Sequence, residues 1–230
     1  MSTRLFTAAA FAAASVFAGC ASEPAEAPAP TPVQPTAAPA PSVTAGDYAI
    51  DNSHAEVGFA VTHLGISKVR GSFDDVDATI RIPDGNLQNM QVTATAQVAS
   101  VNTRNERRDG HLQGDDFFDA ANHPEMTFVS TGVSNIDGNA FDLMGDLTIR
   151  GTTRPVTLQA ELLGESPGMG AGRVIAFHAE GEIDRKAFGL TWDNAVESVP
   201  VVSDEVEIMI DVEGVQMENA TDADGAEVES

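Results

Sequence analysis

The central part of the chain, residues 46–215, alternates apolar and polar positions with a period of two. This alternation puts apolar side chains on one face of an extended segment and polar ones on the other. The clearest runs are 57–61, 90–98, 141–150, 156–162, 175–183 and 206–212. One apolar face and one solvated face are typical of antiparallel sheet. The pattern therefore predicts an all-β domain that closes into a barrel or pairs as a sandwich.

Turn-forming residues separate these runs. Gly, Pro, Asn and Asp cluster at 83–86, 137–139 and 168–172, and such clusters favour a reversal of the chain. We expect about eight strands, several of them longer than the usual five or six residues. Strands of this length favour a tall, elongated barrel.

One segment, near 103–122, breaks the alternation. Thr103–Glu106 fits a capping box, so a short helix is expected to begin there. Gly110 or Gly114 could end it. An insert of this size in a barrel would cover one mouth. The aromatic pair at 117–118 is interpreted as a core plug more readily than as a ligand contact.

The N-terminus has the features of an export signal. Arg4 precedes an apolar run, Leu5–Ala18, of fourteen residues, which is too short to span a bilayer and fits a signal-peptide core. Phe17–Gly19 followed by Cys20 resembles the bacterial lipobox, in which the cysteine is lipidated. We therefore expect a signal peptide at 1–19 and lipidation at Cys20. The alternative is a plain secretory signal in which this cysteine is incidental.

Two segments lack any signal for regular structure. Residues 20–45 form a linker that is rich in proline and alanine, and proline supports neither helix nor sheet. At about 3.1 Å per residue an extended linker of this kind could reach roughly 70–80 Å. Residues 216–230 carry five acidic side chains and no basic one, which is typical of a solvated, disordered tail.

The net charge of the chain limits the kinds of partner that it is expected to bind. The chain has 12 Lys+Arg against 35 Asp+Glu, a formal net charge of −23. Binding to nucleic acid gains its affinity from basic residues that displace counterions, so a nucleic-acid partner is not expected. The single cysteine excludes an intramolecular disulfide and a metal site built from several cysteines.

The sequence lacks the common motifs for metal binding and for catalysis. The histidines are His54, His63, His111, His123 and His178. They form neither H-x-H nor H-E-x-x-H, and a zinc site needs three or four ligands with a close pair. G-x-S-x-G and the phosphate-binding glycine loops are absent too. We therefore assign no metal ligands, no catalytic residues and no cofactor, and we do not expect an enzyme.

Short motifs spread over the whole domain form an ordered series. They are Tyr48–His54, Val57–His63, Gly71–Phe73, Asn102–Thr103, Arg108–Leu112, Asp116–Asp119, His123–Ser130, Gly145–Thr153 and Arg185–Gly189. The series resembles the YceI-like family of exported, lipocalin-like proteins that bind polyisoprenoid lipids. Ala55 and His123 depart from the family pattern, which often has Ser and an aromatic residue there. Each motif is weak alone, but their order along 46–215 is specific.

The resemblance implies a lipocalin-like, antiparallel up-and-down β-barrel with an elongated apolar pocket. Its ligands would be isoprenoid chains, such as quinone or polyprenyl tails, or similar long-chain amphiphiles. We expect the pocket to be lined by Phe59, Val61, Phe73, Phe128, Leu147, Ile149 and Phe177. Arg108 and His111 could meet the ligand's polar head group at the barrel mouth. The favoured interpretation of their cluster, however, is an ion-paired helix face.

These observations predict an exported protein of the bacterial cell envelope, lipid-anchored on the periplasmic side of a membrane, that carries or sequesters an isoprenoid. One alternative is a non-catalytic interaction or stress protein whose barrel is filled by its own side chains. Another is an enzyme that acts on lipid head groups through His111, Asp109 or His178. Neither the lipid nor the oligomeric state, monomer or homodimer, follows from the residues.

Overall fold

A computed structural model of the chain describes residues 39, 41–170, 172–196 and 199–218. The predicted signal peptide, Cys20 and the linker up to residue 38 lie outside these described residues, as does the tail beyond residue 218. The regular elements, in chain order, are β1 (Gly46–His63), β2 (Ser67–Phe73), β3 (Val76–Ile82), η1 (Leu87–Asn89), β4 (Gln91–Gln97), η2 (Val98–Ser100), β5 (Val101–Asn102), α1 (Glu106–Leu112), β6 (Glu125–Asp137), β7 (Ala140–Ile149), β8 (Thr152–Ser166), β9 (Val174–Asp184), η3 (Arg185–Phe188), β10 (Ala195–Val196), β11 (Val199–Pro200) and β12 (Val202–Gln216).

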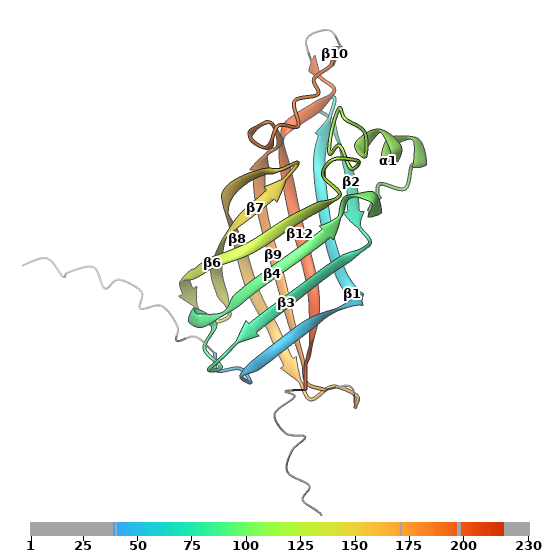
Figure 1. The fold of residues 1–230 in the computed structure, drawn as a ribbon. Coiled ribbons are helices and arrows are strands. Elements are labelled where there is room, and N and C mark those ends of the chain that lie inside the picture. Colours follow the sequence, from blue (N-terminus) through green and yellow to red (C-terminus); the bar gives the residue numbers. More distant parts are fainter. Residues whose placement is uncertain (1–38, 40, 171, 197–198, 219–230) are drawn as a thin grey trace, which may run out of the picture. The chain divides into compact units, whose positions relative to one another are not determined.

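Eight of the strands form a closed antiparallel barrel (Figure 1). The order around the barrel is β12, β9, β8, β7, β6, β4, β3 and β1, and β1 pairs with β12 to close the ring. Most neighbours in the barrel follow one another along the chain, which is the arrangement of an up-and-down barrel. The predicted fold is therefore confirmed, and the sandwich is excluded.

β1 pairs with two different strands along one of its edges. Its beginning, Gly46–Ala49, pairs with β3, and its end, Val57–His63, pairs with β2. β12 follows it on the other side along both parts. With 18 residues in β1 and 15 each in β8 and β12, the barrel is tall, as the run lengths predicted.

One end of the barrel is closed by side chains; we call it the closed end. Tyr48, Ile82, Leu87 and Ile175 are all fully buried there. Val43, just before β1, packs into the same cluster, and its backbone N–H donates to the carbonyl of Gly85 at 3.1 Å. Part of the segment that the sequence assigned to the linker is thus packed on the barrel.

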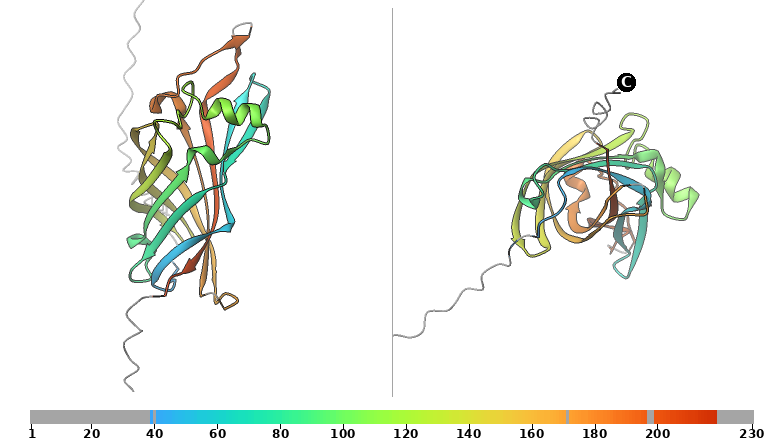
Figure 2. Two further views of the ribbon diagram at one scale, coloured as in Figure 1. Left: turned by 45° about the vertical axis from the view of Figure 1, so that its right-hand side comes forward. Right: turned by 90° about the horizontal axis from the view of Figure 1, so that it is seen from below.

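The opposite end carries the insert; we call it the mouth. α1, the β1–β2 turn and β10 all lie at this end, as Figure 1 and the left view of Figure 2 show. Within the described part of the chain, no helix is long and apolar enough to cross a membrane.

The predicted helix exists, but its predicted cap is wrong. α1 begins at Glu106, and its N-cap is Asn105, whose side-chain oxygen accepts from the backbone N–H of Arg108. Thr103 is instead buried, and its backbone N–H donates to the Asp109 carboxylate at 2.9 Å. Spacing alone does not separate these two options, because both residues are good N-caps. Asn105 prevails because Thr103 is used in packing the mouth.

Candidate functional site

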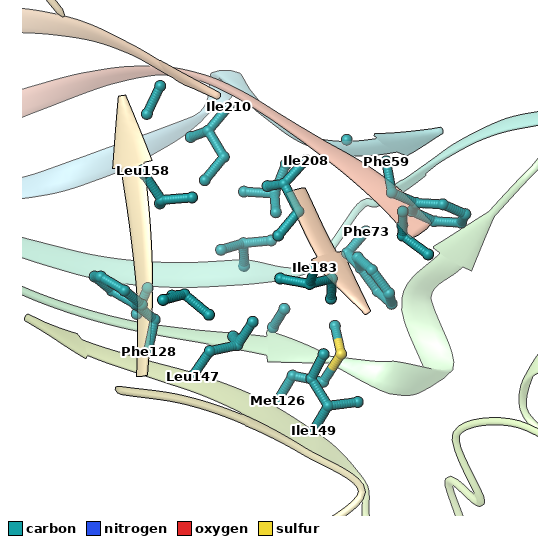
Figure 3. A pocket seen from close by; sticks show the side chains of 18 of the residues that line it. Phe59, Phe73, Met126, Phe128, Leu147, Ile149, Leu158, Ile183, Ile208 and Ile210 are labelled. Carbon is teal, nitrogen blue, oxygen red and sulfur yellow. The ribbon is translucent and has the colours of Figure 1, made fainter. Parts of the chain in front are cut away.

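The interior of the barrel contains a cavity of about 420 Å³. That volume lies within the range of small-molecule pockets, roughly 300–1,000 Å³. Its wall is built from inward-facing side chains of most of the barrel strands. Figure 3 shows side chains such as Ile208, Ile210 and Leu158 pointing into the same space as Phe128 and Leu147 from the other side.

All of the pocket residues expected from the sequence lie on this wall: Phe59, Val61, Phe73, Phe128, Leu147, Ile149 and Phe177. They come from five strands, β1, β2, β6, β7 and β9, which the fold brings around one space. Leu147, Ile208 and Ile210 face inward on their strands and yet are only half-buried. A residue that faces the interior remains accessible only where the interior is not filled, so the barrel is hollow here.

Two glycines give large aromatic side chains their positions in the wall. A methyl group on Gly145 would overlap the ring of Phe128, and one on Gly71 would overlap the ring of Phe59. Each ring therefore occupies the space that a side chain at the glycine would take. This role of the glycines does not follow from the sequence alone, because it depends on which strands are neighbours.

The polar side chains of the wall are concentrated at the mouth. They are His63, Thr103, Arg108, His111, Thr127 and Arg185. Arg108 donates from Nε to the Thr103 hydroxyl at 2.7 Å and from Nη2 to the Thr103 carbonyl at 2.8 Å. An arginine side chain has five N–H donors. The other three have no acceptor among the described residues, so a ligand at the mouth could use them.

Three rings meet beside Arg108. His111 lies edge-on to Phe117 at 5.0 Å and to Trp192 at 5.7 Å between ring centroids, and Phe117 lies 5.2 Å from Trp192. The Nε2 atom of His111 is 3.0 Å from the Asp116 carboxylate. The His111 side chain is 46% exposed and also lines the cavity. The cavity therefore reaches the protein surface at this point.

A buried arginine holds the other side of the mouth. Arg185 donates from Nη1 to the carbonyls of Leu190 and Trp192 at 2.7 and 2.8 Å. Its Nε donates to the carbonyl of Ser203 at 2.9 Å, and its Nη2 to the Asp204 carboxylate at 3.0 Å. The chain after η3 is thereby fixed against β12. Arg185 and Trp192 were not among the expected site residues, because only the fold brings them to the mouth.

The residues considered for catalysis are not gathered in one place. His178 lies on the outward face of β9 and is 2.8 Å from the Asp211 carboxylate, whereas Asp109 is bound to Thr103. Among the described residues, no three His, Cys, Asp or Glu side chains are arranged to hold a metal ion.

Comparison with known proteins identifies the family. The model of the YceI-like domain matches residues 48–214. The chain belongs to the YceI-like family. Protein YceI of Escherichia coli O157:H7 is 41% identical over 177 residues, covering 76% of this chain and 90% of its own length. Protein YceI of Salmonella arizonae is 40% identical over the same extent.

Solved structures agree with this membership. The Campylobacter jejuni YceI protein is 36% identical, with a TM-score of 0.60 over 68% of this chain and 90% of that one. Two more distant structures share the YceI-like fold: Burkholderia cenocepacia BcnA, with a TM-score of 0.62 at 24% identity, and a polyisoprenoid-binding domain from Saccharophagus degradans, with 0.59 at 16%. They cover 71% and 74% of this chain and 98% of each of their own.

Proposed function

We propose that this protein binds one long-chain apolar lipid, an isoprenoid such as a quinone or polyprenyl tail, inside its barrel and carries or sequesters it. The observation that supports this most strongly is the hollow, apolar interior, with polar side chains only at the mouth. An eight-stranded barrel is just wide enough for one slim ligand. The polyisoprenoid-binding domain named above, which shares the fold, makes an isoprenoid the first ligand to test.

The polar mouth gives such a ligand a defined orientation. The apolar tail would lie along the wall formed by the inward strand residues, with the head group beside Arg108 and His111. Arginine suits phosphate, carboxylate and carbonyl oxygens because its donors form a fixed fork. The sequence allows two interpretations of the cluster that contains Arg108 and His111: an ion-paired helix face, or a contact for the ligand's head group. The hydrogen bonds from Arg108 to Thr103 favour the second, because they hold the guanidinium group in place at the mouth. No carboxylate is paired with Arg108 among the described residues.

A binding role fits the energetics of transfer between phases. Burial stabilises an apolar tail by about 0.8 kcal/mol per carbon group relative to water. The lipid would come from a bilayer, however, where the tail is already out of water. Transfer into the cavity is then close to neutral, so the protein would exchange its ligand with membranes instead of retaining it permanently.

The test is to identify what the protein holds when it is isolated. We expect native mass spectrometry of the purified chain to show a barrel with one added mass. Solvent extraction should then release an isoprenoid or another long-chain lipid in a one-to-one ratio. A chain that is empty on isolation, and still empty after incubation with quinone and polyprenyl vesicles, would favour the alternative of an interaction or stress protein.

We also propose that the chain is exported and anchored through a lipid on Cys20, which places the barrel in the bacterial cell envelope. The apolar run at 5–18 and the position of the only cysteine directly after it support this. Several acyl chains would make the anchor firm. Cys20→Ser should move the protein from the membrane fraction to the soluble fraction of the envelope. An unchanged membrane-bound fraction would contradict the anchor.

A further inference from the structure

The cavity stops short of the closed end, and its limit lies between two layers of buried side chains. The layer next to the cavity lines it and also belongs to the hydrophobic core; it contains Ile80, Met90, Phe141, Ala160 and Phe177. The layer behind it belongs to the same core but is not part of the cavity wall; it contains Tyr48, Ile82, Leu87, Leu162 and Ile175. We call the first layer the floor of the cavity.

Two phenylalanine rings pack against each other in this floor. Phe141 and Phe177 meet edge to face, with their ring centroids 6.3 Å apart and their planes at 88°. Only 3% of Phe141 and 6% of Phe177 is exposed. The two rings come from β7 and β9, which are separated by β8, and Ala160 on β8 pairs with Phe141. Because Ala160 is small, the rings can meet across the strand between them.

The chemistry of the floor differs from that of the mouth. Every side chain of the floor is apolar, whereas the mouth carries Arg108 and His111. A polar group buried against the floor would lose its hydrogen bonds to water and find no new partner, which is unfavourable. A ligand that reaches the floor must therefore end there in an apolar group, so it has one polar end and one apolar end.

The distance from the floor to the mouth follows from β12. Val212 pairs with Phe177 at the floor, Val202 pairs with His63 at the mouth, and both valines line the cavity. At about 3.3 Å per residue they lie roughly 33 Å apart along the strand. A strand tilt of about 40° reduces this to roughly 25 Å along the barrel axis. An acyl chain spans half of a hydrocarbon core, or roughly 15 Å, so the cavity is longer than such a chain.

We propose that Phe141 and Phe177 set the length of the tail that the barrel accepts, and that the ligand is a single-tailed amphiphile whose tail is longer than an ordinary acyl chain. This inference rests on the proposed function, because it concerns the same cavity. The mouth holds the head group, and the two rings block the tail at the other end. A tail that is too long leaves carbon groups outside the cavity. One that is too short leaves wall side chains without contacts.

Competition among tails of different length tests this proposal. The purified chain would be incubated in detergent with an equimolar series of quinones whose polyprenyl tails differ only in length, and the bound quinones would be identified by native mass spectrometry. We expect one favoured length. The bound amount should fall at least about tenfold for the next longer tails, because burial of a whole isoprene unit is then lost. Quinones with tails no longer than an acyl chain should also load less than the favoured one.

Two variants should move the favoured length in opposite directions. Phe177→Ala removes one ring of the floor and should lengthen the favoured tail by about one isoprene unit, which has nearly as many carbons as the ring. Ala179→Leu adds a side chain at the next inward position of β9 towards the mouth and should shorten it. Two matched controls should leave the favoured length unchanged. Phe188→Ala removes a buried ring that does not line the cavity, and Ala176→Leu adds the same side chain on the outward face of β9, which also carries His178.

The inference is overturned if a folded Phe177→Ala or a folded Ala179→Leu keeps the favoured length of the unchanged chain, so either variant suffices should the other fail to fold. It is also overturned if Phe188→Ala shifts the length as much as Phe177→Ala does. An unchanged chain that loads quinones of every length equally overturns the role of the floor but leaves the proposed function standing. A chain that loads none of these quinones contradicts the proposed function as well.

Discussion

Asp51, Ser53 and His54 form a polar cluster in the middle of β1. The hydroxyl of Ser53 donates to Asp51 at 2.7 Å, and Nδ1 of His54 lies 2.9 Å from the same carboxylate. The hydrogen bond from Ser53, followed by that from His54, lowers the pKa of Asp51 to about 2. The Asp51 carboxylate in turn raises the pKa of His54. The cluster lies between Ile50 and Ala55, where the pairing with β12 shifts register.

This cluster should make stability depend on pH in a definite window. Because the folded-state pKa of His54 is raised, its contribution is fully present below the ordinary value of 6.5 and is lost as pH rises through the raised value. The contribution of Asp51 is present above 3.8 and is lost as pH falls towards about 2. His54→Gln should therefore lower the melting temperature more at pH 5 than at pH 9. An equal difference at both pH values would contradict this assignment.

The strands could be predicted from the sequence wherever their alternation is unbroken. The end of β1 and most of β4, β7, β8, β9 and β12 follow runs of period two, and all six exist. β6 was not found by alternation, because two register shifts interrupt it, one between Ser130 and Gly132. β2 was not found either, because Gly71 occupies an inward position where an apolar side chain would have marked the face. β3 alternates cleanly, so the sequence was sufficient to predict it, although it is not among the runs given above.

The cavity wall and the mouth differ in how far the sequence reveals them. A large apolar residue on the inward face of a strand belongs either to the core or to a cavity, and its spacing does not distinguish the two. The seven expected wall residues followed from the strand pattern together with the family resemblance. The contacts of Arg185 with the segment that carries Trp192 did not follow, because their partners depend on tertiary packing. Those contacts set the shape of the mouth.

The described part of the chain is a tall barrel with one closed end and one polar mouth. Fully buried side chains such as Tyr48 and Leu87 fill the closed end. From there to the mouth the inward residues are apolar and leave space. This arrangement suits a ligand whose apolar tail enters first and whose head group stays at the surface.

The most direct test is to fill the cavity and measure how much lipid remains bound. Ala94 faces the cavity from β4, between Ala78 and Phe128 on the neighbouring strands. Thr93, the preceding residue, is exposed on the outer face. Ala94→Phe places a ring in the space that the lipid would occupy, whereas Thr93→Phe adds the same ring on the outside of the barrel. Circular dichroism and the melting temperature would show whether both variants fold.

We expect bound isoprenoid, measured by extraction, to fall at least about tenfold in Ala94→Phe, since each 1.4 kcal/mol of lost binding is a factor of ten. Thr93→Phe should retain lipid at the level of the unchanged chain. Equal lipid content in a folded Ala94→Phe and in the unchanged chain would show that the ligand is not held in this cavity, and it would contradict the proposed function.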